Sequence, residues 1–390
     1  MKIYEKSIKI GELFCGPGGF AEGAKKAGGF THVWANDLHS DTCKTFKNRH
    51  PDCEVIKGDV YKEFIKKEMK NMKKIEGLLF GFPCNDFSIA GKTEGLKGKY
   101  GPLYKAACKV LNHFKPNFFV AENVSSIAPP NAKHKDSERF KNFTKIMSDL
   151  SRCSEHGYHI YADKLKFEEY GVPQTRHRQI LVGYRGDFFK KNNISYKKPN
   201  GNLPTISCKT ALEEGVPGTN QKGSVDDLKK PFNNEYTKHS KDVKLRLENT
   251  KEGQNVWQIA DEFGLPGVKS ARMSQIYKKL ESDKPAYTVT GSGGGGTHVY
   301  HYKENRALTN RERARLQTFD DNYKFEGNKE SVRRQIGMAV PVVAAKKILT
   351  AVKNSLKKQP ERIKYHHDIM IEPFGKKLSF TAEIQLDLDL

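Results

Sequence analysis

Apolar and amphipathic segments alternate through the first third of the chain. Short apolar runs predict buried strands at residues 7–14, 32–36, 54–57, 77–80 and 117–121. Apolar positions at helical spacing predict helices between them, at residues 20–27, 41–49, 61–74 and 104–114. Pro116 ends the last of these helices. This alternation predicts an α/β fold with a parallel, doubly wound sheet.

The pattern changes after Arg185. Residues 186–305 are polar and rich in Gly, Asn and Lys, without strand–helix alternation, which indicates a second, smaller domain. Helical spacing returns at Arg306 and continues through residues 340–349. Residues 377–386 show some alternation and predict a strand or hairpin, but the C-terminal stretch suggests no function.

Composition narrows the class of partner. The 390 residues include 68 Lys+Arg against 46 Asp+Glu, a net charge of +22. Such an excess favours a polyanion, most simply nucleic acid, over the alternative of a lysine-rich surface that serves solubility. The 7 cysteines contain no CxxC pair and no metal-ligand spacing, so we expect a reducing compartment and no metal. No apolar run approaches the roughly 18 residues of a membrane span, and the N-terminus lacks a signal peptide. We therefore expect a cytoplasmic protein with no membrane partner.

One cysteine is a candidate nucleophile. Cys84 follows the apolar run 77–80 in the segment Gly81-Phe82-Pro83-Cys84-Asn85-Asp86-Phe87-Ser88. The proline-fixed turn would hold the thiol at the carboxyl edge of the sheet, where open α/β sheets carry their chemistry. A thiol there is a nucleophile if nearby positive charge lowers its pKa. The alternative is a small buried apolar residue, the usual role of a free cysteine.

A glycine-rich loop, Phe14 to Phe20, lies between the first predicted strand and helix. Glycines let a ligand approach the backbone, and the helix start offers N–H groups to a carboxylate or phosphate. Asp37 stands where an acid binds ribose hydroxyls, and Asp59 could bind an adenine amino group. The loop is not GxGxxG, which disfavours NAD and favours a nucleoside with a charged amino-acid tail. The alternative is a tight structural turn with two surface acids.

Two further segments carry charge at strand ends. Glu122 ends the strand at 117–121 and could bind a ring nitrogen and exocyclic amine, or else form a solvent-facing ion pair. Arg176 and Arg178 precede the apolar strand 179–183, and strand alternation places them on one face. Two guanidiniums there suit a pyrimidine carbonyl and a phosphate. The alternative is a basic strand entry.

The chain resembles the DNA (cytosine-5) methyltransferases of bacterial restriction–modification systems. Six segments carry the resemblance in the family's order: residues 14–19, 81–88, 122–124, 174–178, 306–319 and 335–341. The chain departs from the pattern at Met338, where the family usually has Asn.

The resemblance implies a Rossmann-like methyltransferase domain with a smaller target-recognition domain. We expect a catalytic and cofactor-binding domain at 1–185, a target-recognition domain at 186–305, a bracing segment at 306–331, a returning helix at 332–358 and an extension of unknown role at 359–390.

The resemblance also implies the reaction and its residues. S-adenosyl-L-methionine would donate a methyl group to C5 of a flipped-out cytosine, leaving S-adenosyl-L-homocysteine, with no metal. The catalytic residues would be Cys84, Glu122, Arg176 and Arg178. The residues expected to bind the cofactor are Phe14, Gly16, Pro17, Gly18, Gly19, Asp37, Leu38, Asp59, Val60, Gly81, Pro83, Leu103, Met338 and Val340.

Double-stranded DNA is the expected partner of a monomeric protein, and a cognate restriction endonuclease is a candidate partner. The residues expected to contact DNA are Ser88, Lys92, Lys97, Lys99, Gln174 and Thr288. Two alternatives share the motifs: a tRNA cytosine-5 methyltransferase of the same fold and an inactive DNA-binding homologue. The long segment 186–305 favours DNA over tRNA.

Overall fold

The computed structural model describes residues 7–82, 103–128, 137–260, 263–264, 277–291, 299–357, 359–375, 377–380 and 384–386. Its contacts divide the chain into two compact units. Unit 1 comprises Met1–Lys166, His177–Asn200 and Ala345–Leu390, and unit 2 comprises Phe167–Arg176 and Gly201–Ala344. The functional domain boundaries expected from the sequence stay predictions.

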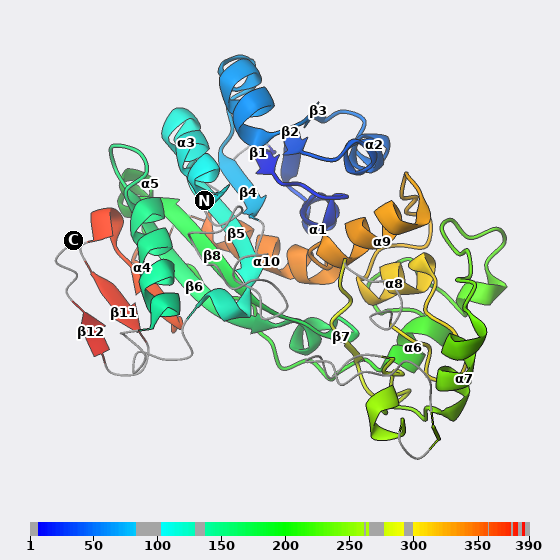
Figure 1. Cartoon of the computed structure of the whole chain (residues 1–390). Coiled ribbons are helices and arrows are strands. Elements are labelled where there is room, and N and C mark those ends of the chain that lie inside the picture. Colours follow the sequence, from blue (N-terminus) through cyan, green and yellow to red (C-terminus); the bar gives the residue numbers. More distant parts are fainter. Residues whose placement is uncertain are drawn as a thin grey trace. The chain divides into compact units, whose positions relative to one another are not determined.

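Unit 1 is built on a ten-stranded sheet with the order β12-β11-β10-β6-β8-β5-β4-β1-β2-β3 (Figure 1). Five strands pair in parallel: β1 (Ile8–Leu13), β2 (Phe30–Asp37), β3 (Glu54–Lys57), β4 (Gly77–Gly81) and β5 (Phe118–Val124). The others pair antiparallel: β6 (Tyr158–Lys166), β8 (His177–Arg185), β10 (Ile369–Ile371), β11 (Leu378–Phe380) and β12 (Ile384–Leu386). The α/β fold is confirmed, and the sheet as a whole is mixed.

Helices α1 (Gly19–Ala27), α2 (Ser40–Arg49) and α3 (Tyr104–Phe114) of unit 1 follow the predicted alternation closely, and most of α10 (Val342–Ser355) lies in unit 1 where helical spacing returns. Unit 1 also contains α4 (Glu138–Ser151) and α5 (Gly186–Lys191), which the sequence pattern did not predict. Helix α3 has the predicted bounds because Lys115 turns left-handed (φ 48) and Pro116 follows it. The helix predicted at 61–74 is wrong in detail. The chain forms a π-helix at Val60–Glu68 and a 3₁₀ turn at Met69–Asn71, then leaves helical geometry.

Close packing under the sheet depends on a missing side chain. Trp34 on β2 is fully buried, and its indole Nε1 donates to the Lys73 carbonyl oxygen at 3.1 Å. A Cβ atom at Gly11 of β1 would lie 2.3 Å from the Trp34 ring, so only glycine fits there. The first two strands therefore pack the largest aromatic side chain of the core against the backbone of β1.

The C-terminal extension completes one side of this sheet. β10 pairs antiparallel with β6, from Ile369 opposite Ala162 to Ile371 opposite Ile160. The hairpin predicted at 377–386 is present as β11 and β12, which pair antiparallel. Without these strands β6 would be an unpaired edge, which is a template for aggregation.

Unit 2 contains more irregular chain. Its helices are α6 (Cys208–Glu213), α7 (Lys241–Asn249), α8 (Asn310–Leu316) and α9 (Lys329–Met338), with 3₁₀ turns at Phe167–Tyr170, Val225–Asp227 and Val256–Gln258. Its two short strands, β7 (Gln174–Thr175) and β9 (Ala286–Tyr287), pair in parallel.

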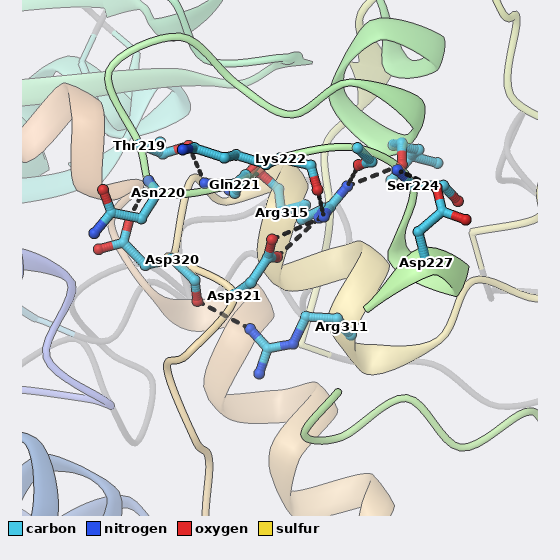
Figure 2. Close-up of polar contacts among 12 residues, drawn as sticks. Thr219, Asn220, Gln221, Lys222, Ser224, Asp227, Arg311, Arg315, Asp320 and Asp321 are labelled. Atoms are coloured by element: carbon cyan, nitrogen blue, oxygen red, sulfur yellow. Dashed lines mark hydrogen bonds and ion pairs between the residues drawn. The ribbon is translucent and has the colours of Figure 1, made fainter. Parts of the chain in front are cut away.

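Buried arginines of α8 hold the loops of unit 2 in place (Figure 2). Arg315 is fully buried; its Nε and Nη2 donate to the Asp321 carboxylate at 2.8 Å each, and Nη1 donates to the Leu212 and Gly223 carbonyls. Arg311 donates to the carbonyls of Phe232 and Asp320. Charge-assisted bonds to several carbonyls offset the desolvation of the guanidiniums, so both arginines act as internal braces.

One helical stretch, Lys329–Ser355, is long and apolar enough to cross a membrane by length and composition, among the residues described. It joins α9 and α10, and 72% of its apolar window is buried within the protein. Such burial is typical of a core helix.

A buried polar cluster fixes the C-terminal extension to β6. The Asp163 carboxylate accepts from His367 Nδ1 at 2.8 Å, from the Asp368 N–H at 3.0 Å and from Lys198 Nζ at 3.2 Å. Asp163→Ala leaves three donors without this acceptor, so we expect a loss of about 2–4 kcal/mol in the free energy of unfolding of unit 1. Urea denaturation measures this loss.

Asp368→Ala is the matched control. The Asp368 side chain is 38% exposed, so its ion pair with Lys198 is screened and its removal should cost about 1 kcal/mol or less. Equal losses in the two variants would contradict the assignment of Asp163 as the centre of the cluster.

Candidate active site

The strand order of unit 1 gathers the predicted site residues at one edge. In the order β3-β2-β1-β4-β5, the carboxyl ends carry Asp59, Asp37, the loop at 14–19, Gly81 and Glu122 in turn. β8 is antiparallel, so its first residues lie at the same edge, with Arg178 opposite Val124. The topology thus brings side chains that are far apart in the sequence, from the loop at 14–19 to Arg178, to the same edge of the sheet, as expected for an open α/β sheet.

The glycine-rich loop after β1 is strained and open. Phe14 adopts a left-handed conformation (φ 54), which is uncommon for a residue with a side chain and is typical of functional sites. Gly16 and Gly18 also have positive φ, at 56 and 97. A Cβ atom at Gly16 would meet no heavy atom within 4 Å, so the loop leaves open space above its backbone.

Asp37 ties this loop to the end of β2. Its Oδ2 accepts the Gly16 N–H at 3.0 Å, and its Oδ1 accepts the His39 N–H at 3.0 Å. Burial raises the pKa of Asp37 above its usual 3.8, while these backbone bonds partly lower it. Burial, and then the charge of Asp37, raise the pKa of Glu12 well above its usual value.

Asp59 and Asn36 also lie at this edge of the sheet, at the carboxyl ends of β3 and β2. Asp59 Oδ1 accepts the N–H groups of Tyr61 and Lys62 at 2.9 and 3.0 Å, which caps the π-helix. Asn36 is buried and its Nδ2 donates to the carbonyls of Ile56 and Gly58 at 2.9 and 3.1 Å. Sequence patterns did not indicate this role for Asn36. The open glycine backbone between two acids fits a nucleoside with an amino-acid tail.

A partly buried ion pair lies at the same edge of the sheet. Arg178 Nε lies 2.8 Å from Glu122 Oε1, with the two side chains 13% and 12% exposed. Gly81 is paired with Glu122 in the sheet, and a Cβ atom on Gly81 would lie 3.4 Å from Glu122 Oε2. The missing side chain keeps space beside a carboxylate whose orientation the guanidinium fixes.

The Glu-Asn-Val segment also positions the chain that leads to Cys84. The Asn123 Nδ2 donates to the Phe82 carbonyl at 3.0 Å, and Asn123 is 1% exposed. Phe82 is the last residue before the segment Pro83–Ser88. This contact was not predicted from the sequence, although residues 122–124 were identified there as a segment that resembles the family, which could have drawn attention to Asn123. The predicted site residues Pro83, Cys84, Ser88, Lys92, Lys97 and Lys99 lie outside the described residues.

The two arginines of the Gln-x-Arg-x-Arg segment have different partners. Arg176 belongs to unit 2, is 3% exposed, and donates from Nη1 to the Val289 carbonyl at 3.1 Å and from Nη2 to the Ala339 carbonyl at 3.2 Å. Arg178 belongs to unit 1 and pairs with Glu122. Both the shared face expected for these arginines and a catalytic role for Arg176 stay predictions; the described bonds of Arg176 are to backbone carbonyls.

Gln174 and Gln317 form a buried amide pair in unit 2. Gln174 Nε2 donates to Gln317 Oε1 at 2.9 Å and to the Leu316 carbonyl at 2.8 Å, and Gln174 Oε1 accepts the Val289 N–H. Gln317 Nε2 donates in turn to the carbonyls of Ile336 and Ala339, at 2.6 and 3.3 Å. The Thr288 hydroxyl donates to the Thr175 carbonyl at 2.6 Å. DNA contacts for Gln174 and Thr288 stay predictions, and Gln317 was missed as a partner of Gln174.

The remaining residues that were expected to bind the cofactor differ in exposure. Leu38 and Met338 are exposed, at 59% and 57%, whereas Val60 and Val340 are buried. Leu103 is the N-cap of α3 in unit 1. Among the residues described, no cluster of three or more His, Cys, Asp or Glu side chains could hold a metal ion.

Comparison with known proteins gives one family. Residues 8–354 match the model of the C-5 cytosine-specific DNA methylase family. The type II methyltransferase M.BbvI of Brevibacillus brevis is 46% identical over 361 residues, covering 88% of this chain and 90% of that protein. The type II methyltransferase M.NgoFVII of Neisseria gonorrhoeae is 35% identical, covering 93% and 91%.

Solved structures show the same fold. A chain titled as a DNA modification methyltransferase encoded within an E. coli prophage aligns with a TM-score of 0.65 at 24% identity, covering 90% of this chain and 99% of that one. The Entamoeba histolytica methyltransferase EhMeth aligns with a TM-score of 0.59 at 15% identity, covering 90% and 100%.

The position of Asp37 generates a test of cofactor binding. We expect Asp37→Asn to weaken binding of S-adenosylmethionine about 10- to 100-fold, because a neutral amide is a poorer acceptor than a carboxylate. Burial raises the pKa of Asp37 above its usual 3.8. As the pH drops from neutrality, the carboxylate of the wild type should therefore become protonated, and the affinity should fall, at a higher pH than for an exposed aspartate. Titration calorimetry as a function of pH measures both effects.

Asp52→Asn is the control, because Asp52 is exposed and lies outside the loop. It should keep wild-type affinity and wild-type pH dependence. An Asp37→Asn variant that still showed the acid-induced loss of affinity would remove Asp37 from the site.

The amide pair predicts energetic coupling within unit 2. We expect Gln174→Met and Gln317→Met each to destabilise unit 2 by about 1–3 kcal/mol, because each leaves buried partners unsatisfied. The double variant should show a coupling energy of roughly 0.5–3 kcal/mol in a double-mutant cycle by urea denaturation. Gln335, which donates to the Glu326 carbonyl and Ser331 Oγ, supplies the comparison. Gln174→Met with Gln335→Met should be additive, and additivity in the first cycle would refute the coupling.

Proposed function

The chain belongs to the C-5 cytosine-specific DNA methylase family, and from this premise we propose that it methylates C5 of a flipped-out cytosine at a specific site in double-stranded DNA. The observation that carries the proposal is the 2.8 Å ion pair of Glu122 and Arg178. It lies at the sheet edge that also carries the open glycine loop and the residue before Pro83–Cys84.

S-adenosylmethionine, when bound, supplies the methyl group. The loop at 14–19, Asp37 and Asp59 are the residues that would hold it. Gly16 and Gly18 expose backbone to the ligand, and Asp37 offers a carboxylate positioned by two N–H bonds. Val60, Leu38 and Leu103 would supply apolar contacts to the base.

The chain's own residues then act on the extruded cytosine. Extrusion costs a few kcal/mol of stacking and pairing, which contacts in the pocket offset. The Cys84 thiolate forms a bond to C6, and the C5–C6 electron pair moves so that C5 becomes nucleophilic. N3 takes up a proton from water, and the Glu122 carboxylate stabilises this protonated N3 and binds the exocyclic amine. Arg178 holds the Glu122 carboxylate and binds the O2 carbonyl.

After C5 has taken the methyl group, a base removes the proton from C5, the C6–S bond breaks, N3 gives its proton back to water, and the aromatic ring is restored. The thiolate is thereby regenerated, so no oxidant or reductant is needed.

Unit 2 would then read the sequence. We assign Arg176, Gln174 and Thr288 to positioning, because their bonds tie β7 to the backbone at 288–289 and 339. Phosphate contacts would set the register of the duplex and base-edge contacts would set the target. A cognate restriction endonuclease and a monomeric state stay predictions.

Trapping with a duplex that contains 5-fluorocytosine tests the proposal. Fluorine at C5 cannot leave as a proton does, so the wild type should accumulate a covalent protein–DNA adduct. Cys84→Ser should form no adduct while still binding DNA. Glu122→Gln should trap about 10²- to 10⁴-fold more slowly, because the carboxylate that stabilises the protonated N3 is lost.

The outcomes separate the alternatives. An adduct with tRNA and none with DNA would favour the tRNA branch, and none with either would favour an inactive DNA-binding homologue. Bisulfite sequencing of plasmid DNA from expressing cells identifies the methylated site.

A further inference from the structure

We propose that unit 1 carries a second contact for double-stranded DNA, away from the edge that carries Glu122. It is a basic strip formed by Lys190, Lys191, Lys197, Arg362 and Lys364, and it binds the phosphate backbone without reading sequence. All five side chains belong to exposed residues of unit 1. The inference rests on the proposed function only in taking DNA as the substrate.

The strip is an ordered surface, because two segments distant in sequence are bonded to each other. Asn193 Nδ2 donates to the carbonyls of Gln359 and Pro360 at 3.3 and 2.9 Å. The Ile363 N–H donates to Ser195 Oγ at 2.7 Å. Just beyond, His367 Nε2 bonds to the Tyr196 carbonyl at 2.9 Å and anchors the segment at its C-terminal end.

Aromatic rings hold two of the cations in place. The Arg362 guanidinium lies over the Phe189 ring at 5.0 Å, and the Lys197 ammonium lies over the Tyr365 ring at 5.8 Å. Phe189 itself stacks on His159 with ring centroids 4.0 Å apart. Cations with restricted side chains lose less entropy on binding a phosphate than mobile surface lysines do.

The cations of the strip are not neutralised by neighbouring acids. Asp163 and Asp368, the acids beside this surface, pair with Lys198 at 3.2 and 2.9 Å. In the part of the chain that is described, no carboxylate lies within ion-pair distance of the five strip cations. Residues 188–200 contain no Asp or Glu, and Glu361 is the acid within 359–366. The strip therefore presents net positive charge to a polyanion.

The position of the strip makes it a separate contact. Lys190 and Lys191 end α5, which begins directly after Arg185 at the end of β8. That end of β8 pairs with the start of β5, with Tyr184 opposite Phe118, whereas Glu122 pairs with Ile180 near the other end. The 359–366 part also lies beyond residues 8–354, the range matched by the family model.

Salt dependence of binding tests the strip directly. We compare the wild type with Lys191→Gln/Lys197→Gln/Arg362→Gln/Lys364→Gln on a duplex without a target site. Each phosphate contact contributes about 0.9 to the slope of log K against log salt concentration, so we expect the slope to fall by roughly 2–4. Methyl transfer to a short duplex that carries one target site should keep its kcat, because the active site is unchanged.

The matched control replaces Lys66, Lys70, Lys73 and Lys74, which are also exposed residues of unit 1, with Gln. It removes the same charge and should keep the wild-type slope. An unchanged slope in the strip variant, or an equal fall in both variants, overturns the proposal. Loss of methyl transfer by the wild type would refute the proposed function instead, and leaves the binding comparison intact.

Discussion

The antiparallel register of β5 and β8 is the constraint on which the candidate site depends. Glu122 lies near the C-terminal end of β5, and Arg178 lies near the N-terminal end of the antiparallel strand β8, so both are at the same edge of the sheet. Successive side chains on a strand point to opposite faces, so a slip of one residue would turn one partner away. The 2.8 Å bond between the two side chains is therefore a direct consequence of the pairing of Val124 with Arg178. The five parallel strands bring the glycine loop and two acids to the same edge.

The segment Gln174–Arg178 contributes side chains to both units. Gln174 and Arg176 bond within unit 2, and Arg178 bonds within unit 1, with the boundary falling between residues 176 and 177. Arg178, which pairs with Glu122, and Arg176, which binds carbonyls of unit 2, are thus two residues apart in the chain.

Much of unit 1 could be predicted from periodicity alone. The bounds of β3 and α3 were predicted as observed, and β1, β2, β4 and β5 within a few residues. The order of the antiparallel strands could not be predicted, although β8 and the hairpin of β11 and β12 were expected as elements, because the pairing of β6 with β10 joins residues about 200 apart in sequence. Buried amides such as Asn36 and Gln317 also escaped, because a polar residue at an internal position has no pattern until its carbonyl partners are known.

Net charge alone does not say where a polyanion binds. Part of the positive charge behind the net +22 lies inside the protein, because Arg311, Arg315 and Arg176 donate to backbone carbonyls rather than to solvent. Arg178 is balanced by Glu122. What remains for a phosphate backbone is the set of cations that are exposed, ordered and free of acidic neighbours. Sorting the cations by their partners, rather than counting them, is what distinguishes Arg362 of the strip, which lies over an aromatic ring, from Lys67 of the π-helix, which already pairs with Glu63.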